Sequence, residues 1–369
     1  MLQDYGLGPA EPTPRNKAME LGPRDRLSQA YWHEKRKGRT VATPRGDVVH
    51  LDLRHLGEAR LRERLPQIYE LALQYLGVDP ARAPIPVLPA VHYTMGGILA
   101  DARTAAPLVG LYSAGECSSI GIHGANRLGS NSLTELLVFG KVAGVEAARH
   151  ARAQPPGDAV ALDRLAEAAR EQALAALQGG GTAHGGAGSK GTNGGRGERI
   201  ATLRREMAQS MEEGCGIYRS ETGIRATCDK LAELKERARR VQLDDHSRAW
   251  NTEWLLVLEL SFQLDVAEAM AHSALHRRES RGSHQRLDGF EERDDTNFLR
   301  HSLATHDLAG PPRIGYGAVK ITRSPPGVRA YGAAGEQASE QASEQAGKHA
   351  EGRAEGQAPA ASNPQRHHA

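Results

Sequence analysis

The stretch GLYSAGECSSIGIHGANRLGSNSL, residues 110–133, decides the fold of this chain. Its first five residues, GLYSA, are a short apolar run that predicts a buried strand. Glu116 follows almost directly, and Asn131 with Ser132 then begins a helical pattern that continues to Arg149, with Glu135 expected in the first turn. Strand, acidic residue, glycine-rich loop and helix together predict an α/β unit whose loop is large enough to hold a ligand.

The sequence on both sides of this unit carries patterns of regular structure. Alternation predicts a half-buried strand at 46–53, and a second alternating run lies at 317–322. We expect helices over 24–37, over 58–76 with a kink or an early start at Pro66, and over several segments between 198 and 279. The region after residue 334 is of low complexity, so we expect it to be disordered.

Composition excludes several classes of protein. The 369 residues carry a formal net charge of +2, which gives no electrostatic reason to expect nucleic acid as a partner. Cys117, Cys215 and Cys228 lack the spacing of a metal site, and we predict no metal ligands. The most apolar run, 254–264, is too short to span a membrane and contains Glu259. We therefore expect a soluble chain with reduced thiols that reaches any membrane through a partner.

Polar residues in three separate segments suggest an anion site. Arg24 follows Pro23 at the start of a predicted helix, His92 precedes a glycine pair, and Arg127 with His123 lies in the loop of the α/β unit. The guanidinium of arginine binds a carboxylate through two parallel hydrogen bonds, and two such cations can hold both ends of a dicarboxylate. An acidic residue after a strand, as at Glu116, suits a ribityl hydroxyl, and the start of the next helix suits the pyrimidine edge of a flavin.

Each of these residues has a plainer interpretation. His92 alone is more often a structural histidine, and Arg24 alone a solvated charge at a helix end. Arg127 would then be a surface arginine, and Glu116 a helix cap. On the residues alone, the combination supports an anion-binding α/β protein, with flavin dependence as one option.

Longer motifs make the prediction more specific, because together they resemble the flavoprotein subunits of fumarate reductase and succinate dehydrogenase. GLYSAGE and HGANRLGSNSL resemble the second FAD-contacting segment of that family, HYTMGGI at 92–98 its substrate-histidine motif, and ELGPRD at 20–25 the motif of its proton-donating arginine. Three later motifs resemble its helical and terminal domains: MEEGCGIYR at 211–219, ESRGSHQR at 279–286 and ERDDTNFLRH at 292–301.

The resemblance implies a role for seven residues. Arg24 donates a proton to the substrate; His92, Thr94 and Arg127 bind it, and Glu116, Ser132 and Leu133 contact FAD. It implies no role for His123, which we interpret as a structural loop histidine. In the family, the glycine fingerprint for the FAD pyrophosphate and the histidine that carries the flavin covalently lie upstream of these motifs. We therefore expect a truncated product, or a start assigned at an internal methionine.

The fold class expected is α/β plus α, a partial FAD-binding α/β domain with a capping-domain remnant, followed by a helical domain and a small terminal domain. The domains expected, in chain order, are a capping remnant at 1–90, the second FAD-binding segment at 91–151, the helical domain at 152–283, the terminal domain at 284–334 and a tail at 335–369.

The function that the resemblance implies is interconversion of fumarate and succinate in anaerobic respiration, with an iron–sulfur subunit and membrane-anchor subunits as partners at the cytoplasmic face of the inner membrane. A succinate dehydrogenase subunit is the first alternative. L-Aspartate oxidase shares the HGANR and Asn-Ser-Leu motifs, but the ESRG and RDD motifs favour the respiratory subunits. An inactive remnant that only docks an iron–sulfur subunit is the alternative from another class.

Overall fold

The computed structural model describes residues 24–44, 46–155, 157–178, 197–308 and 310–321. The predicted tail at 335–369, and most of the ELGPRD motif, lie outside these ranges. The chain divides into two compact units, Met1–Ala30 with Lys320–Ala369, and Tyr31–Val319. Nearly all of the described structure belongs to the second unit.

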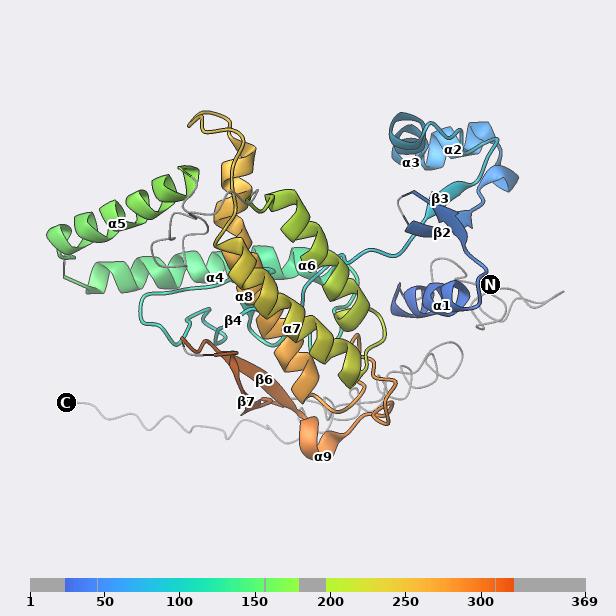
Figure 1. The fold of residues 1–369 in the computed structure, drawn as a ribbon. Coiled ribbons are helices and arrows are strands. Elements are labelled where there is room, and N and C mark those ends of the chain that lie inside the picture. Colours follow the sequence, from blue (N-terminus) through green and yellow to red (C-terminus); the bar gives the residue numbers. More distant parts are fainter. Residues whose placement is uncertain (1–23, 45, 156, 179–196, 309, 322–369) are drawn as a thin grey trace, which may run out of the picture. The chain divides into compact units, whose positions relative to one another are not determined.

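The first part of the second unit combines a small antiparallel sheet with short helices (Figure 1). Helix α1 spans Arg24–Arg36, and the sheet has the order β1-β2-β3, with strands Val41–Thr43, Gly46–Leu51 and Ile85–Val87. The strand predicted at 46–53 is confirmed as β2, which ends at Leu51, but the exposure of its residues does not alternate strictly: Val48 is buried, and Gly46 and His50, two positions away on either side, are exposed. Five residues form the local core: Leu53, Leu61, Tyr69, Ala72 and Ile85.

The helical segment predicted over 58–76, with a kink or an early start at Pro66, is confirmed, and it is divided at Pro66. It consists of α2 at Glu58–Arg64, α3 at Pro66–Leu71 and a π-helix, η3, at Ala72–Leu76, and the short η2 at Arg54–Leu56 precedes it. Pro66 lacks a backbone N–H and so begins a new helix at the position where its missing donor costs nothing. Three apolar residues of this segment, Ile68, Leu73 and Leu76, are exposed.

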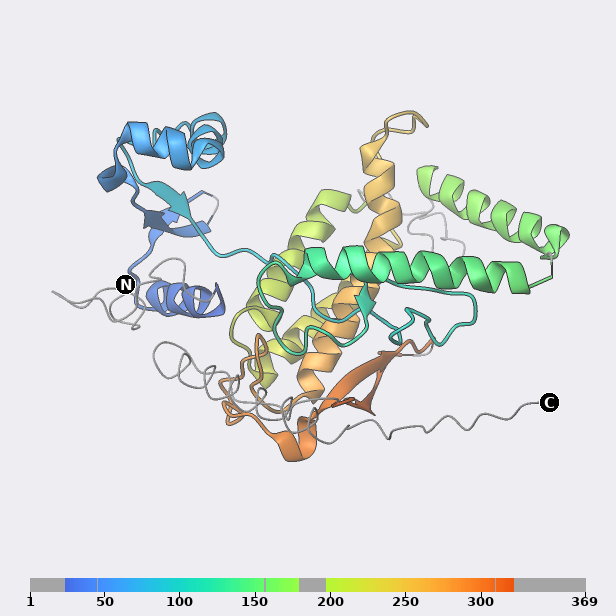
Figure 2. The same cartoon turned by 180° about the vertical axis from the view of Figure 1, so that it is seen from behind.

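The strand predicted at 110–114 is also absent. Tyr112 makes only an isolated bridge to Ala105, and the parallel pair of this region joins β4 at Ile98–Leu99 to β5 at Ser118–Ser119. Gly110 and Gly115 both have positive φ, which breaks the extended backbone at either end of the run. Glu116 therefore lies in the turn before β5 rather than after a strand. The helix of the α/β unit is confirmed as α4, Asn131–Ala153 (Figure 2).

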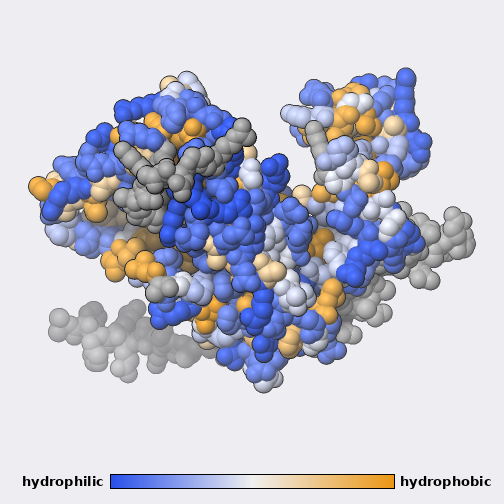
Figure 3. Space-filling view, viewed as in Figure 1, coloured by the Kyte–Doolittle hydropathy of each residue, from blue (hydrophilic) through white to orange (hydrophobic). Residues whose placement is uncertain are grey.

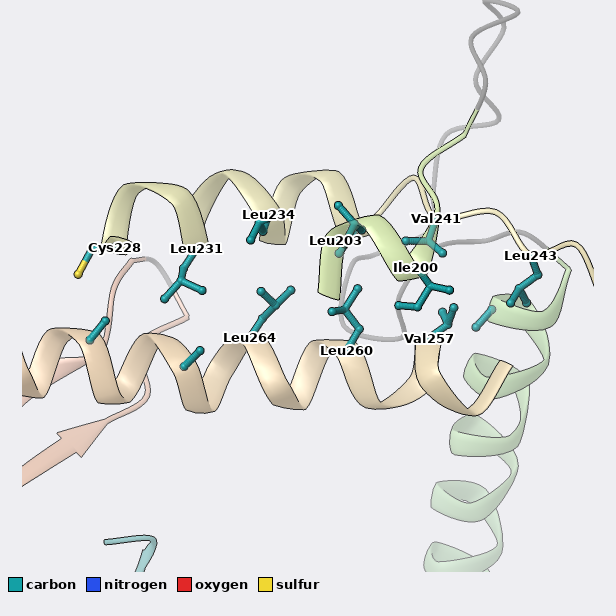
Figure 4. Close-up of a cluster of buried hydrophobic side chains, with 14 of the residues drawn as sticks. Ile200, Leu203, Cys228, Leu231, Leu234, Val241, Leu243, Val257, Leu260 and Leu264 are labelled. Atoms are coloured by element: carbon teal, nitrogen blue, oxygen red, sulfur yellow. The ribbon is translucent and has the colours of Figure 1, made fainter. Parts of the chain in front are cut away.

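The helices predicted between 198 and 279 are confirmed. They are α6 at Ile200–Cys215, α7 at Glu221–Ala238 and α8 at Thr252–His276, and α5 at Ala159–Leu177 precedes them. Helices α6, α7 and α8 pack on one another (Figure 1). Figure 4 shows their leucines facing one another, and Leu203, Leu231 and Leu260 are fully buried. Burial of this size stabilises the helices by roughly 1.5–3 kcal/mol per side chain.

The chain continues through a turn-rich segment to α9 at Asp295–Phe298 and a hairpin of β6 at Arg300–Thr305 and β7 at Arg313–Ala318. Strand β7 begins four residues before the alternation predicted at 317–322 and ends inside it. Most of the visible surface is hydrophilic, with scattered apolar patches (Figure 3). Within the described residues, the helices are too short or too polar to cross a membrane.

Candidate functional site

Two loops that carry predicted site residues lie side by side. The parallel pair β4 and β5 joins them, and Ile98 N donates a hydrogen bond to the Cys117 carbonyl at 2.9 Å. Gly97 has a φ of +135°, and a Cβ at this position would collide with the same carbonyl oxygen. The HYTMGGI motif thus needs glycine at this position, because no other residue allows the loops to approach so closely.

A buried cluster of three side chains links the HYTMGGI loop, the HGANR loop and α4. Glu135 Oε2 accepts hydrogen bonds from the Tyr93 hydroxyl at 2.7 Å and from His123 Nε2 at 2.6 Å. The side chains of His123 and Glu135 are only 8% and 1% exposed. Desolvation, and then the hydrogen bond to Glu135, raises the pKa of Tyr93 to about 12. The cluster supports the structural interpretation of His123.

Arg127 lies beside this cluster. Its guanidinium stacks over the Tyr93 ring at 4.5 Å from the centroid, and Nη1 donates to the Leu128 carbonyl at 3.2 Å. Its backbone N–H points to the Met95 sulfur at 3.1 Å. The Nε atom is buried and has no hydrogen-bond partner among the described residues. A buried N–H donor without an acceptor is costly, so this atom suits a ligand oxygen.

The other predicted substrate residues share the loop with Tyr93. His92 is exposed and Thr94 is half-buried. The backbone N–H of Thr94 donates to Glu116 Oε1 at 3.0 Å, which ties the two loops together a second time. The structure thus brings His92, Thr94, Arg127 and Glu116 into one small region.

The start of α4 carries the remaining predicted cofactor residues. Ser132 is half-buried, and Leu133 is 63% exposed. Asn131 and Ser132 do not cap the helix as expected: the cap position is Ser130, with a φ of +62° and no side-chain cap hydrogen bond. The expectation that Glu135 lies in the first turn is also wrong: it is the fifth residue of α4, beyond the first turn, and its carboxylate is buried against His123.

Arg24 begins α1, in the first compact unit. Its side chain is exposed, and Asp25 follows it in the first turn of the helix. A carboxylate in that turn stabilises the helix dipole. Arg24 thus has the position at the helix start that the sequence predicts.

The ESRGSHQR segment holds the HGANR loop from the other side. Ser283 N and Ser283 Oγ both donate to the Ala125 carbonyl, at 2.9 Å and 3.0 Å. Gly282 has a φ of +58°, and a Cβ there would collide with the same carbonyl. A motif more than 150 residues away in the sequence thereby fixes the backbone two residues before Arg127.

No group of three or more His, Cys, Asp or Glu side chains within the described ranges could hold a metal ion. The residues of the candidate site instead suit organic anions and a flavin. The exposed Glu116 carboxylate can accept from ribityl hydroxyls, Leu133 offers an apolar contact for a ring, and the start of α4 without a side-chain cap favours negative charge. These three features together fit FAD.

Comparison with known proteins finds two family models that match separate segments of the chain. Residues 7–133 match the family described as FAD binding domain. Residues 204–331 match the family described as fumarate reductase flavoprotein C-term. Over these two segments the chain is similar to the flavoprotein subunits of fumarate reductase and succinate dehydrogenase.

Individual relatives give the extent of the match. A fumarate reductase flavoprotein subunit from a Serratia species is 54% identical, over 90% of this chain and 53% of the relative. A solved quinol-fumarate reductase from E. coli superimposes with a TM-score of 0.78 at 53% identity, over 89% of this chain and 54% of that one. A succinate dehydrogenase flavoprotein subunit from Coxiella burnetii is 37% identical, over 78% and 48%. The chain spans about half the length of these relatives.

Sequence reasoning missed two residues of the site, Tyr93 and Glu135. Tyr93 lies between His92 and Thr94, so its position in the motif was a signal. Glu135 lies four residues after Asn131 on α4, and the same helical face carries both towards His123.

Proposed function

We propose that this chain supplies the dicarboxylate site of a fumarate reductase flavoprotein subunit that interconverts fumarate and succinate. The observation that carries the proposal is the buried Arg127 Nε, which has no acceptor among the described residues. Its guanidinium stacks on Tyr93, the residue between His92 and Thr94 in the chain. A substrate carboxylate placed there would accept from Nε and from a second guanidinium N–H, the bidentate geometry that arginine provides. His92 and Thr94 would add hydrogen bonds to the same end of the substrate.

Glu116, Ser132 and Leu133 would hold the FAD, which in its reduced form would supply a hydride to one olefinic carbon of fumarate and be oxidised. Arg24 would deliver the proton to the other carbon. Arginine is a poor acid in water because its pKa is high, so neighbouring groups must lower the cost of deprotonation or pass the proton on in concert. In this proposal the chain binds the dicarboxylate and supplies the proton donor, Arg24.

The fumarate reductase type is favoured over succinate dehydrogenase by the relatives, at 54% against 37% identity. An iron–sulfur subunit and membrane-anchor subunits would be the partners, at the cytoplasmic face of the inner membrane. The quinol-fumarate reductase structures, which contain homologous chains, support this assignment.

The first test is dicarboxylate binding to the 369-residue chain, measured by equilibrium dialysis with labelled fumarate. Arg127→Ala removes the clamp, and we expect affinity to fall by about 10- to 100-fold, the value of a charge-assisted hydrogen bond pair. Arg152→Ala changes an exposed arginine at the far end of α4 and serves as the control. Equal affinity of the wild type and Arg127→Ala would refute the proposed site.

A further inference from the structure

We infer that Tyr93, His123 and Glu135 are positioning residues that hold the Arg127 guanidinium in place for a substrate carboxylate. The inference rests on the proposed function and deepens it. It concerns side chains to which the family resemblance gave no role.

The first step is the arrangement of hydrogen bonds around Glu135. The Tyr93 hydroxyl and His123 Nε2 both lie within 2.7 Å of the same oxygen, Oε2, and within 3.1 Å of each other. A carboxylate only accepts, so Tyr93 and His123 are both donors to it. Asn131 Nδ2 lies 3.5 Å from His123 Nδ1, on the opposite side of the imidazole. His123 is thus held from both ring nitrogens, and Tyr93 is held by its hydroxyl.

The second step concerns the ring that this cluster fixes. With its hydroxyl anchored and its plane almost perpendicular to the His123 ring, at 86°, Tyr93 presents a face to Arg127. Cation–π attraction is stronger at a partly desolvated site, and a hydroxyl that donates to a carboxylate makes the aromatic ring more electron-rich. The buried charge of Glu135 therefore acts on Arg127 through Tyr93.

The third step is the consequence for the ligand. The stacked plane and the Nη1 bond to Leu128 leave Nε of Arg127 buried and without an acceptor. A guanidinium that is already oriented loses less rotational entropy when a carboxylate binds. The three side chains thus orient the Arg127 guanidinium before a carboxylate binds, and they do so without contacting the substrate.

The experiment uses the 369-residue chain and two readouts. The first is hydrogen exchange of the arginine Nε–H groups, followed by nitrogen-15 NMR, in which Arg127→Lys identifies the Arg127 signal. The second is affinity for malonate, a dicarboxylate that cannot be reduced. We expect Glu135→Gln and Tyr93→Phe to speed Nε–H exchange about 10-fold, and Tyr93→Leu to speed it further.

Malonate affinity should follow the same order. Tyr93→Phe keeps the aromatic ring and loses only the hydrogen bond to Glu135, so we expect malonate affinity to fall by about 3-fold. In Tyr93→Leu the ring is lost as well, and we expect a fall of about 30-fold. Tyr112→Phe is the matched control, because Tyr112 also packs edge-to-face on a histidine, His150, away from Arg127. We expect this variant to leave both readouts unchanged.

The outcomes separate the two proposals. Wild-type chain that does not bind malonate contradicts the proposed function, and Nε–H exchange then still decides the positioning role. Exchange and affinity that stay within about 2-fold of wild type in Tyr93→Phe, Tyr93→Leu and Glu135→Gln would overturn the inference. Tyr93→Phe removes a single oxygen atom, so it keeps the test valid if the other two variants do not fold.

Discussion

Two titratable side chains at the residue scale report directly on packing. The Tyr93 phenol is desolvated and donates to Glu135, so its pKa rises from 10.0 to about 12. His284 is buried between Arg219 and the Arg277 carbonyl. Its Nδ1 accepts from Arg219 Nη1 at 2.8 Å, and Nε2 donates to that carbonyl at 3.0 Å. Burial, and then the Arg219 charge, lowers the pKa of His284 to about 3.

The Tyr93 phenol should stay protonated in the folded chain at about pH 11, where solvent-exposed tyrosines ionise. Because the folded pKa is the higher one, the stability from this group is complete below the unfolded value of 10.0 and is lost as pH rises towards about 12. The measurement is the ultraviolet difference titration of wild type against Tyr93→Phe. If the titration of wild type shows one more phenol ionising near pH 10 than that of Tyr93→Phe, then Tyr93 is solvated and the expectation is wrong.

His284 should make the chain acid-sensitive. Its folded pKa is the lower one, so the stability it contributes is present above the unfolded value of 6.5 and is lost as pH falls towards about 3. We expect the His284 contribution to fall by about 1.4 kcal/mol per pH unit in that window. His284→Gln keeps a donor and an acceptor but does not titrate, and the exposed His55 gives the control variant His55→Gln. Denaturation by urea at several pH values gives the free energy of unfolding as a function of pH. The same dependence on pH in wild type and His284→Gln would contradict this prediction.

At the element scale, the ESRGSHQR segment should determine the shape of the HGANR loop. Gly282→Ala adds a methyl group against the Ala125 carbonyl, whereas Gly289→Ala adds one with nothing within 4 Å. Both glycines have positive φ, so the backbone strain is shared and the difference measures the contact. We expect Gly282→Ala to cost about 1–3 kcal/mol more in stability and to weaken fumarate binding.

The Gly282 comparison needs thermal unfolding and equilibrium dialysis on both variants. A Gly282→Ala chain as stable as Gly289→Ala, with unchanged fumarate affinity, would mean that the terminal segment does not position the loop.

The elements differ in how far the sequence predicts them. Helices α6, α7 and α8 follow from 3.6-residue periodicity, because each buries apolar residues that recur three or four positions apart. Helix α4 was predicted as well, although the residue that it buries is the polar Glu135. The strand at 110–114 failed because a strand forms only beside a partner, and local pattern does not show whether the partner is there. Pro66 was noticed, but whether it kinks or restarts a helix depends on the packing of both halves.

Within the candidate site, His92, Thr94, Glu116 and Arg127 were predicted from motifs, and the structure places them on adjoining loops. Tyr93 and Glu135 were not predicted, since their function depends on a contact across 42 residues that periodicity does not contain. Their polar atoms are satisfied by one another, and such internal pairs leave little trace in a single sequence.

At the scale of the whole molecule, we propose that this chain contributes both the arginine that binds a substrate carboxylate, Arg127, and the proton donor, Arg24. Joining the chain to the upstream region of the E. coli flavoprotein gives a polypeptide of the relatives' length in which the two roles can be separated. Arg24→Lys keeps the charge but changes reach and proton affinity. The matched control is Arg26→Lys, an exposed arginine on the same helix α1.

The decisive measurement is steady-state fumarate reduction by these variants, beside malonate affinity. We expect Arg24→Lys to lose about 100-fold or more in turnover while malonate binds within about 3-fold of wild type, as for a lost general acid. Arg26→Lys should change neither quantity. Near-normal turnover in Arg24→Lys would make Arg24 an ordinary helix-end charge and would contradict the proposed role.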